Sequence, residues 1–205
     1  FVTYTGTFRG VVVSVTSTGI GGPSAAIAVE ELAACGADTF IRVGTAGGIS
    51  RRVAAGEMVV AGAAVRQDGT SREYAPLEYP AAADFAVTRA LVEAAEARCL
   101  SFHVGTVQSK DSFYGQHSPE RMPVAERLEA QWLAWKRLGV LCSEMEAAAI
   151  FTVAASLGLR AGCLLSVLWN QERAAAGLTD QPADEGRKMD EVIETALEGV
   201  APPEV

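Results

Sequence analysis

Histidine and cysteine are scarce in this sequence, and their spacing argues against several kinds of site. The 205 residues include two histidines and four cysteines, and no two cysteines form a C-x-x-C pair. A structural zinc site therefore has little support, no metal is expected, and reduced thiols in a cytoplasmic protein are the expected state. Long apolar runs are also missing: none approaches the roughly 18 residues that a membrane-spanning helix needs.

Positive charge is in short supply as well. The chain has 17 lysines and arginines against 25 aspartates and glutamates, which gives a net charge of −8. Nucleic acids and anionic membranes attract basic surfaces, so neither is expected as a partner. A small anionic substrate is still compatible with this charge, because one or two arginines can bind it locally.

Strand and helix patterns alternate along the chain. The expected strands are 1–9, 11–16, 39–45, 57–66, 102–108, 141–145 and 161–169. The expected helices are 23–34, 84–98, 124–138, 147–157 and 184–197, and the polar segment 112–123 is expected to be a loop. Such alternation predicts an α/β fold, with a central mixed β-sheet flanked by helices, and the length fits a single domain. Ligands of these sheets bind where strands end and Gly-rich loops begin.

Arg42 lies between two apolar residues of an expected buried strand, Ile41 and Val43. A buried guanidinium is costly unless it is paired, so Arg42 needs either a carboxylate or a bound anion. The strand runs into Thr45-Ala-Gly-Gly, where a hydroxyl and the N–H groups of a flexible backbone suit an anion such as phosphate. The residues alone do not decide whether Arg42 pairs with a carboxylate or with a bound anion. If the partner is an anion, Arg42→Ala is expected to leave the fold mostly intact.

The segment Ser143-Glu-Met-Glu-Ala places two carboxylates two residues apart. In an extended chain Glu144 and Glu146 share one face and Met145 takes the other. Acids are tolerated at a helix N-terminus, which is the structural interpretation. The functional interpretation is a carboxylate that accepts hydrogen bonds from the vicinal hydroxyls of a sugar.

The segment from Lys110 to Arg121 mixes aromatic, amide and cationic side chains. Phe113 offers a face on which a planar base can stack. Gln116 can donate and accept hydrogen bonds at once, which matches an amide edge such as that of uracil. Arg121 is a candidate for holding a carbonyl oxygen on which negative charge develops.

Five stretches, taken in order, resemble the uridine phosphorylase family within the wider group of nucleoside phosphorylases and hydrolases. They are STGIGGPS from Ser17, IRVGTAGGI from Ile41, APLEYPAAADF from Ala75, SKDSFYGQ from Ser109 and SEMEAAAIF from Ser143. The resemblance covers nearly the whole chain in this order. SEMEAAA alone would be less specific, because hydrolases of this fold share it.

The resemblance implies a role for each matching residue. It assigns phosphate binding to Arg42 and Thr45. It assigns base binding to Phe113, Gln116, Arg121, Leu168 and Trp169, and ribose binding to Glu144, Met145 and Glu146. Of these, Arg42, Gln116 and Arg121 would carry the catalysis. Ile20 and Ser24 fall where some relatives hold a potassium ion at a subunit interface.

The implied reaction is uridine plus phosphate giving uracil and ribose 1-phosphate, catalysed by a pentosyltransferase with no cofactor beyond its co-substrate phosphate. A homo-oligomer, either a dimer or a hexamer, and a cytoplasmic location are implied with it. The resemblance also implies that the first core strand of the fold lies upstream of Phe1. We therefore expect the chain to be one phosphorylase domain, residues 1–205, that lacks its N-terminal strand.

The chain departs from the family's pattern at its base-reading residues. Gln116 and Arg121 are five apart rather than two, with His117 between them, so Lys110 or His117 is a rival to Arg121. Position 46 is alanine, where a second hydroxyl is common.

Two rival functions remain. One is a purine phosphorylase or hydrolase of the same fold, whose usual aspartate is Asn170 here, and an amide cannot protonate a leaving purine. The other is an inactive binding domain, which the nearly complete set of site residues disfavours.

Overall fold

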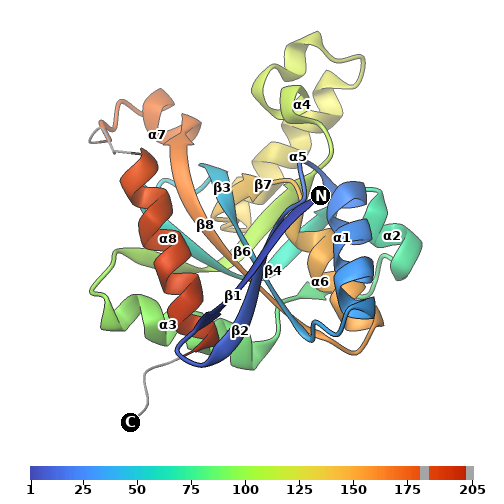
Figure 1. Ribbon diagram of the computed structural model, residues 1–205. Helices are drawn as coiled ribbons and strands as arrows, with labels where there is room; N and C mark the ends of the chain where they lie inside the picture. Colours follow the sequence, from blue (N-terminus) through green and yellow to red (C-terminus); the bar gives the residue numbers. More distant parts are fainter. Residues whose placement is uncertain (181–184, 202–205) are drawn as a thin grey trace.

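The strand and helix order of the computed structural model, which describes residues 1–180 and 185–201, follows most of the prediction (Figure 1). The strands are β1 (Val2–Phe8), β2 (Val11–Ser17), β3 (Thr39–Gly48), β4 (Met58–Gln67), β5 (Ala81–Ala82), β6 (Phe102–Lys110), β7 (Cys142–Glu144) and β8 (Arg160–Asn170). The helices are α1 (Gly22–Ala34), α2 (Thr70–Tyr74), α3 (Phe85–Ala97), α4 (Phe113–His117), η1 (Pro119–Arg121), α5 (Ala125–Arg137), α6 (Ala147–Ser156), α7 (Gln171–Ala175) and α8 (Glu185–Val200). None of these helices is long and apolar enough to cross a membrane.

The prediction of a loop over 112–123 is wrong. Ser112 caps a short helix, α4, because its hydroxyl accepts a hydrogen bond of 3.0 Å from Gly115 N. Pro119 then opens the 3₁₀ turn η1. A hydroxyl N-cap and a proline in the first turn are both helix-start signals, and they outweigh the polar composition of the segment. The short elements α2, β5 and α7 are further additions to the predicted set.

Five strands of the main sheet close into a ring. Their order is β4-β6-β7-β3-β8, and β4 also pairs with β8, while β5 adds to the outer edge of β4. β3 is parallel to β8 but antiparallel to β7, so the sheet is mixed, as predicted. Ser143 of β7 pairs with Gly47 on one side and with Gln108 on the other. This short strand therefore brings the end of β3 next to the end of β6, and both strand ends carry candidate site residues.

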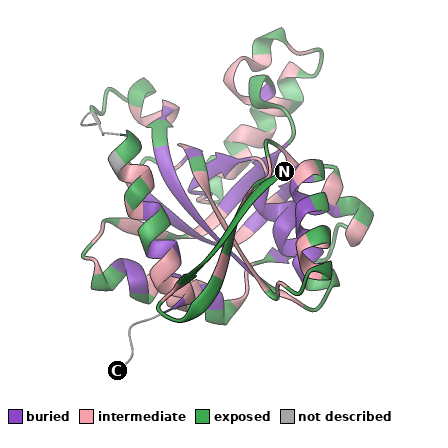
Figure 2. Ribbon diagram, viewed as in Figure 1, coloured by how far each residue is buried: buried purple, intermediate pink, exposed green. Residues whose placement is uncertain are grey.

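Helices cover the ring on two sides, each with its own core. On one side α6 is buried along its whole length up to Ala154 and packs against α1 and α2. On the other side α3 packs against α8, and Leu91, Val192 and Ala196 fill the space over the sheet. Figure 2 shows the sheet and α6 buried and the outer helix faces exposed. The core is thus built from one apolar face per helix, with the more completely apolar α6 at the centre.

The hairpin of β1 and β2 lies outside the ring. The two strands pair only with each other in the described residues, in register from Val2↔Ser17 to Phe8↔Val11. Apolar side chains on it are open to solvent, including Tyr4 at 75% and Val12 at 71% exposed. At its tip Arg9 donates to Ala201 O and lies 3.6 Å from a carboxylate oxygen of Glu198, which fixes the turn against α8.

Candidate active site

Arg42 on β3 reaches two carboxylates that lie more than a hundred positions away in the sequence. Its Nε donates to Glu144 Oε2 at 2.7 Å, and its Nη2 lies 2.5 Å from Glu146 Oε2. Burial by itself would lower the pKa of Arg42, but the negative charges around it, led by Glu144, raise that pKa instead. The guanidinium is therefore permanently charged. Of the two partners that the sequence left open for it, a carboxylate or a bound anion, the structure contains the carboxylate.

The two glutamates are held by their own hydrogen bonds as well. Glu144 Oε2 accepts from the backbone N–H groups of Glu146 at 2.8 Å and Ala147 at 2.9 Å, and Glu144 Oε1 accepts from the Ser109 hydroxyl. Glu146 Oε1 accepts from Gly21 N at 2.6 Å, just before α1. Glu144 is thus saturated by protein donors. The Glu146 carboxylate has two partners among the described residues, one side chain and one backbone group, and is the more available of the two.

Gly44 provides the space over which Arg42 lies. A Cβ at position 44 would lie 2.1 Å from Arg42 Nη1, which is too close for two non-bonded atoms. Residues two apart on a strand share a face, so any side chain at 44 competes directly with that of Arg42. Nε and Nη2 of Arg42 bond the glutamates, whereas Nη1 has no hydrogen-bond partner in the described part of the chain.

Gly44→Ala is therefore expected to displace the guanidinium and lower the free energy of unfolding by about 3–5 kcal/mol, the cost of breaking a buried ion pair. Gly62→Ala is the matched control, because Gly62 also lies in a strand and a Cβ there meets nothing within 4 Å. Denaturant unfolding of both variants measures the difference. In an Arg42→Ala background Gly44→Ala should cost little more, and a full additional loss there would show that Gly44 does not act through Arg42.

Gln116 on α4 is joined to Lys110 on β6 through Ser143 on β7. Lys110 Nζ donates to Ser143 Oγ at 2.6 Å, and Ser143 Oγ donates to Gln116 Oε1 at 2.7 Å. The other end of the amide, Nε2, lies over Gly47, 3.9 Å from where a Cβ would be. Gln116 therefore presents its donor to the end of β3, on the strand that carries Arg42.

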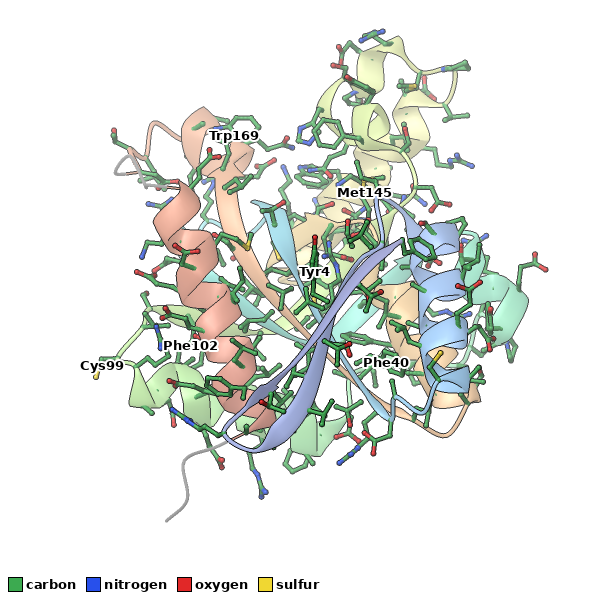
Figure 3. The ribbon with its side chains drawn as sticks, in the orientation of Figure 1. Tyr4, Phe40, Cys99, Phe102, Met145 and Trp169 are labelled. Carbon is green, nitrogen blue, oxygen red and sulfur yellow. The ribbon has the colours of Figure 1, made fainter. Side chains whose placement is uncertain are left out.

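Aromatic side chains form a wall beside this amide. The Phe113 ring lies 4.3 Å from His117 between centroids, and His117 lies 6.3 Å from Trp169 at the end of β8. Phe113 and Trp169 are each about half exposed, at 52% and 51%, as flat faces open to a planar ligand would be. Burial and then the charge of Lys110 lower the pKa of His117, which keeps the ring neutral at pH 7. Figure 3 shows Trp169 and Met145 at the same end of the molecule, on either side of the β3 strand end.

The remaining predicted residues differ in how close they come to this group. Thr45 is exposed on β3, three positions beyond Arg42, and Leu168 is 40% exposed next to Trp169. Arg121 is exposed on η1, and its guanidinium forms no hydrogen bond or ion pair with a described residue. Of the predicted set, Arg42, Glu144 and Glu146 are in contact with one another, and Gln116 is bonded to Ser143 of the same short strand as Glu144. Lys110, Ser143 and Ser109 join this group, and only Lys110 was singled out by the sequence.

Comparison with known proteins identifies the family to which this chain belongs. The sequence model of one protein family, the phosphorylase superfamily, matches residues 1–201. The chain belongs to that superfamily. It is 54% identical over 180 residues to a uridine phosphorylase of Treponema pallidum, an alignment that covers 88% of this chain and 70% of the relative. A uridine phosphorylase of Thermococcus kodakarensis is 51% identical over 173 residues, 82% of this chain and 62% of the relative. A guanosine phosphorylase of Halorubrum lacusprofundi is 42% identical over 160 residues, 78% of this chain and 62% of the relative.

Asn170 has a structural task in this member of the superfamily. Its Nδ2 donates to Ser50 O and Val53 O, both at 2.8 Å, and its Oδ1 caps α7 by accepting from Glu172 N and Arg173 N. All four hydrogen bonds that a carboxamide forms are thus made to the protein. Asn170 is 1% exposed, so its amide faces the 50–53 loop and not a ligand. Asn170 cannot protonate a purine, both because it is an amide and because its side chain faces the 50–53 loop.

Asn170→Asp is expected to lower the free energy of unfolding by about 1–3 kcal/mol, because a carboxylate would face two carbonyl oxygens that lose their donor. Lowering the pH should return part of that loss, since the protonated acid regains one donor. Gln171→Glu is the control, because it adds the same charge one residue away. Chemical denaturation at pH 5 and pH 8 tests this, together with an inosine cleavage assay. Strong inosine cleavage by Asn170→Asp would contradict the orientation described here.

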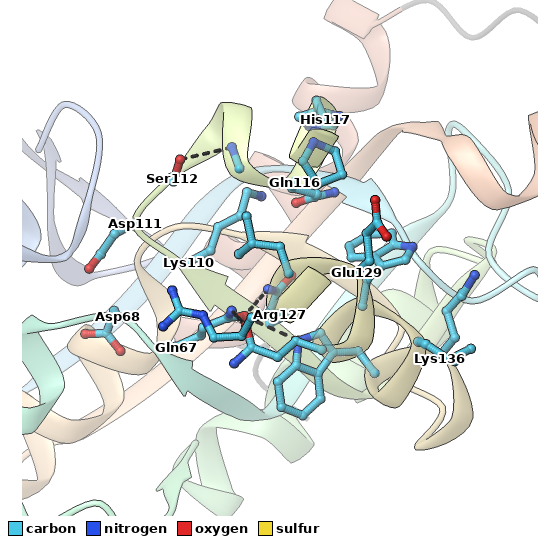
Figure 4. Close-up of a pocket in the computed structure, with 18 of the residues that line it drawn as sticks. Gln67, Asp68, Lys110, Asp111, Ser112, Gln116, His117, Arg127, Glu129 and Lys136 are labelled. Carbon is cyan, nitrogen blue, oxygen red and sulfur yellow. Dashed lines mark hydrogen bonds between the residues drawn. The ribbon is translucent and has the colours of Figure 1, made fainter. Parts of the chain in front are cut away.

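A cavity of about 710 Å³ adjoins the Gln116 side of the site (Figure 4). It lies between α4, α5 and the ends of β4 and β6, and Lys110, Gln116 and His117 line it. Its far wall is held by Gln67, whose Nε2 donates to Gln131 Oε1 at 2.8 Å and whose Oε1 accepts from Trp135 Nε1 at 3.3 Å. The cavity therefore approaches the site from the amide and aromatic side, away from Arg42.

No group of three or more His, Cys, Asp or Glu side chains able to hold a metal ion occurs within residues 1–180 and 185–201. Cys142 and Cys163 are buried, and burial raises the pKa of each thiol. Neutral thiols are poor nucleophiles, so these two cysteines are packing residues.

Proposed function

We propose that this protein is a nucleoside phosphorylase, a pentosyltransferase that cleaves uridine with phosphate to give uracil and ribose 1-phosphate. The observation that carries the proposal is that one strand, β3, carries Arg42 with its two glutamates in its middle and has the Gln116 amide donor over Gly47 near its end. A cation suited to phosphate and a donor suited to a base oxygen are thus brought to the same strand. Superfamily membership and the uridine phosphorylases among the relatives support it.

Phosphate would bind at Arg42 and Thr45. Two nitrogens of the guanidinium already hold Glu144 and Glu146, while Nη1 has no partner among the described residues and can donate to a phosphate oxygen. Glu144 acts as support, because its bonds fix the direction of Arg42. Holding the anion on a rigid strand next to the anomeric carbon turns the attack into an intramolecular one, which is a large source of rate acceleration.

Ribose would bind between Glu146 and Met145. Glu146 has a carboxylate with accepting capacity to spare, as the vicinal hydroxyls of a ribose require, and Met145 is half-buried beside it. As the glycosidic bond breaks, positive charge develops on the sugar and negative charge on the base. Glu146 stabilises the first charge and the Gln116 Nε2–H group stabilises the second. Phe113, Leu168 and Trp169 provide the apolar walls for the base.

Arg121 is a candidate for holding a base oxygen, but its guanidinium is exposed and forms no hydrogen bond or ion pair with a described residue. Lys110 is the buried cation on this side of the site. Of the three candidates for reading or supporting the base, the contacts favour Lys110, acting through Ser143, over Arg121 and His117.

Phosphorolysis of a purine nucleoside is the second candidate function, because one relative is a guanosine phosphorylase. The test measures base release from uridine, thymidine, deoxyuridine, guanosine and inosine, each with and without phosphate. Release of uracil only when phosphate is present, and faster than release of guanine, is the expected result. Equal rates without phosphate would identify a hydrolase, and faster cleavage of guanosine would identify a purine enzyme.

The assembly, the location and the ion are proposals of the same kind. A dimer or hexamer in the cytoplasm, with no cofactor beyond the co-substrate phosphate, is what the resemblance implies. A potassium ion at Ile20 and Ser24 suits the local chemistry, since hydroxyl and carbonyl oxygens are ligands of hard cations. The turn is exposed, with Ile20 at 79%, and the Ser24 hydroxyl bonds Thr18 O, so other oxygens must complete the shell. The strand expected upstream of residue 1 stays a prediction.

A further inference from the structure

Lys110 is a cation buried within the protein rather than at its surface. It is the last residue of β6 and only 6% exposed. Its ammonium group donates to Ser143 Oγ at 2.6 Å and lies 5.9 Å from the centroid of the Phe113 ring, over its face. A buried ammonium is costly, so its position calls for a reason beyond packing.

The hydrogen bonds through Ser143 start at the ammonium group and end at the amide oxygen of Gln116. An ammonium group has donors and no acceptor, so Ser143 must accept from Lys110. The single hydroxyl proton of Ser143 is then donated to the neighbouring oxygen, which is Gln116 Oε1 at 2.7 Å. With Oε1 held by Ser143, the Nε2 end of the Gln116 amide lies over Gly47, near the end of β3.

We propose that Lys110 is a positioning residue of the base site, which acts through Ser143 to fix and polarise the Gln116 amide so that its N–H groups stabilise negative charge on the departing base. No proton is transferred along the chain of hydrogen bonds. The positive charge at its far end withdraws electron density from the amide, and hydrogen bonds in such chains strengthen one another. The inference rests on the proposed phosphorolysis and adds a residue to it.

The charges around Lys110 predict a pH dependence. Burial is the largest influence and lowers the pKa of Lys110 to about 8, although Glu144 and Cys142 of β7 and Glu146 before α6 act in the opposite direction. His117 of α4, whose own pKa is lowered, is neutral where Lys110 titrates. The ammonium is therefore charged below about pH 8, and its effect on Gln116 is lost as the pH rises through that value.

The experiment compares kcat and KM for uridine and phosphate between pH 6 and pH 10 in six proteins. They are the parent, Lys110→Met, Lys110→Arg, Ser143→Ala, the double variant Lys110→Met/Ser143→Ala and the control Lys188→Met on α8. Lys110→Met and Ser143→Ala should lower kcat by about 10- to 100-fold at pH 7, as loss of a charge-assisted hydrogen bond does. The KM for phosphate should change by less than about threefold, because the effect appears in the transition state. Lys188→Met should match the parent.

The shape of the pH profile separates this role from a structural one. The parent should lose kcat above about pH 8, and Lys110→Arg should not, because its guanidinium keeps its charge. Ionisation of the uracil ring of the substrate is the same in every variant and cannot produce such a difference. The double variant Lys110→Met/Ser143→Ala should be no worse than either single one, since both break one path. Parent-like kcat and pH profile in Lys110→Met, or fully additive losses, would overturn the proposal.

A readout without substrate keeps this test separate from that of the proposed function. The side-chain NH₂ signals of Gln116, assigned by their loss in Gln116→Glu, should shift in Lys110→Met and Ser143→Ala and titrate near pH 8 in the parent. If the parent cleaves no nucleoside while these signals behave as described, the proposed function fails and the coupling stands. If the signals do not respond to either variant, the coupling itself is refuted.

Discussion

Replacing Arg42 by alanine is expected to lower the free energy of unfolding by about 3–5 kcal/mol, because it leaves two buried carboxylates facing each other without their cation. The sequence led to the opposite expectation, a fold left mostly intact, on the assumption that a bound anion was the partner. The contacts with Glu144 at 2.7 Å and Glu146 at 2.5 Å reverse it. Urea denaturation of the two proteins gives the number directly.

Two further variants show how much of that loss is charge and how much is geometry. Arg42→Lys keeps the charge but can no longer bond both carboxylates with a planar fork, so its loss should be intermediate. Arg89→Ala is the control, because Arg89 and its partner Glu93 are both 65% exposed, and exposed pairs contribute about 0–1 kcal/mol. An Arg42→Ala protein as stable as Arg89→Ala would show that the glutamates find other partners, and the assignment of Arg42 as their anchor would be wrong.

Replacing Gln116 by alanine is expected to lower kcat for uridine by roughly 10²–10³, the usual effect of removing one donor that meets developing negative charge. Gln116→Glu should be about as severe, although it keeps the size of the side chain, because it exchanges the Nε2 donor for an oxygen. Gln131→Ala is the matched control, since Gln131 lies on α5 across the cavity and its side chain accepts a hydrogen bond from Gln67. Steady-state phosphorolysis of uridine, followed by release of uracil, measures all three.

The unfolding midpoints of these proteins must be compared as well. Gln116 is half-buried on a helix of five residues, so its loss should cost little stability. A fall in kcat at an unchanged midpoint identifies an effect on the reaction. A rise in KM alone, with kcat unchanged, would mean that Gln116 contributes only uniform binding and would remove it from the catalytic group.

The fold could be predicted from the sequence because its signals are local. β-branched runs and Gly-rich ends marked the strands, and Asp84 marked the start of α3 by capping it at 2.9 Å. The alternation of strands and helices then favoured a mixed sheet with helices on both sides. The prediction of a loop over 112–123 was wrong, because it relied on the polar composition of the segment and missed the capping role of Ser112.

Part of the site was also within reach of the sequence. A lone arginine in an apolar strand needs a partner wherever the strand is buried, and two glutamates at a strand-to-helix junction need a cation. The need for a partner of opposite charge can be seen within each of these two segments. The residue types and spacings therefore identified Arg42, Glu144, Glu146 and Gln116 as candidates before any fold was known.

Only the tertiary structure decided which of these side chains are in contact with one another. Arg42 meets Glu144 across 102 positions because β7 joins the ends of β3 and β6. The same strand places Ser143 between Lys110 and Gln116, and no spacing in the sequence points to that bond. Hydrogen bonds depend on separations of a few tenths of an ångström, and such separations between distant segments are set by the packing of the sheet. The sequence by itself therefore determined the fold class and the residue types of the site, and the closed ring of strands determined their pairing.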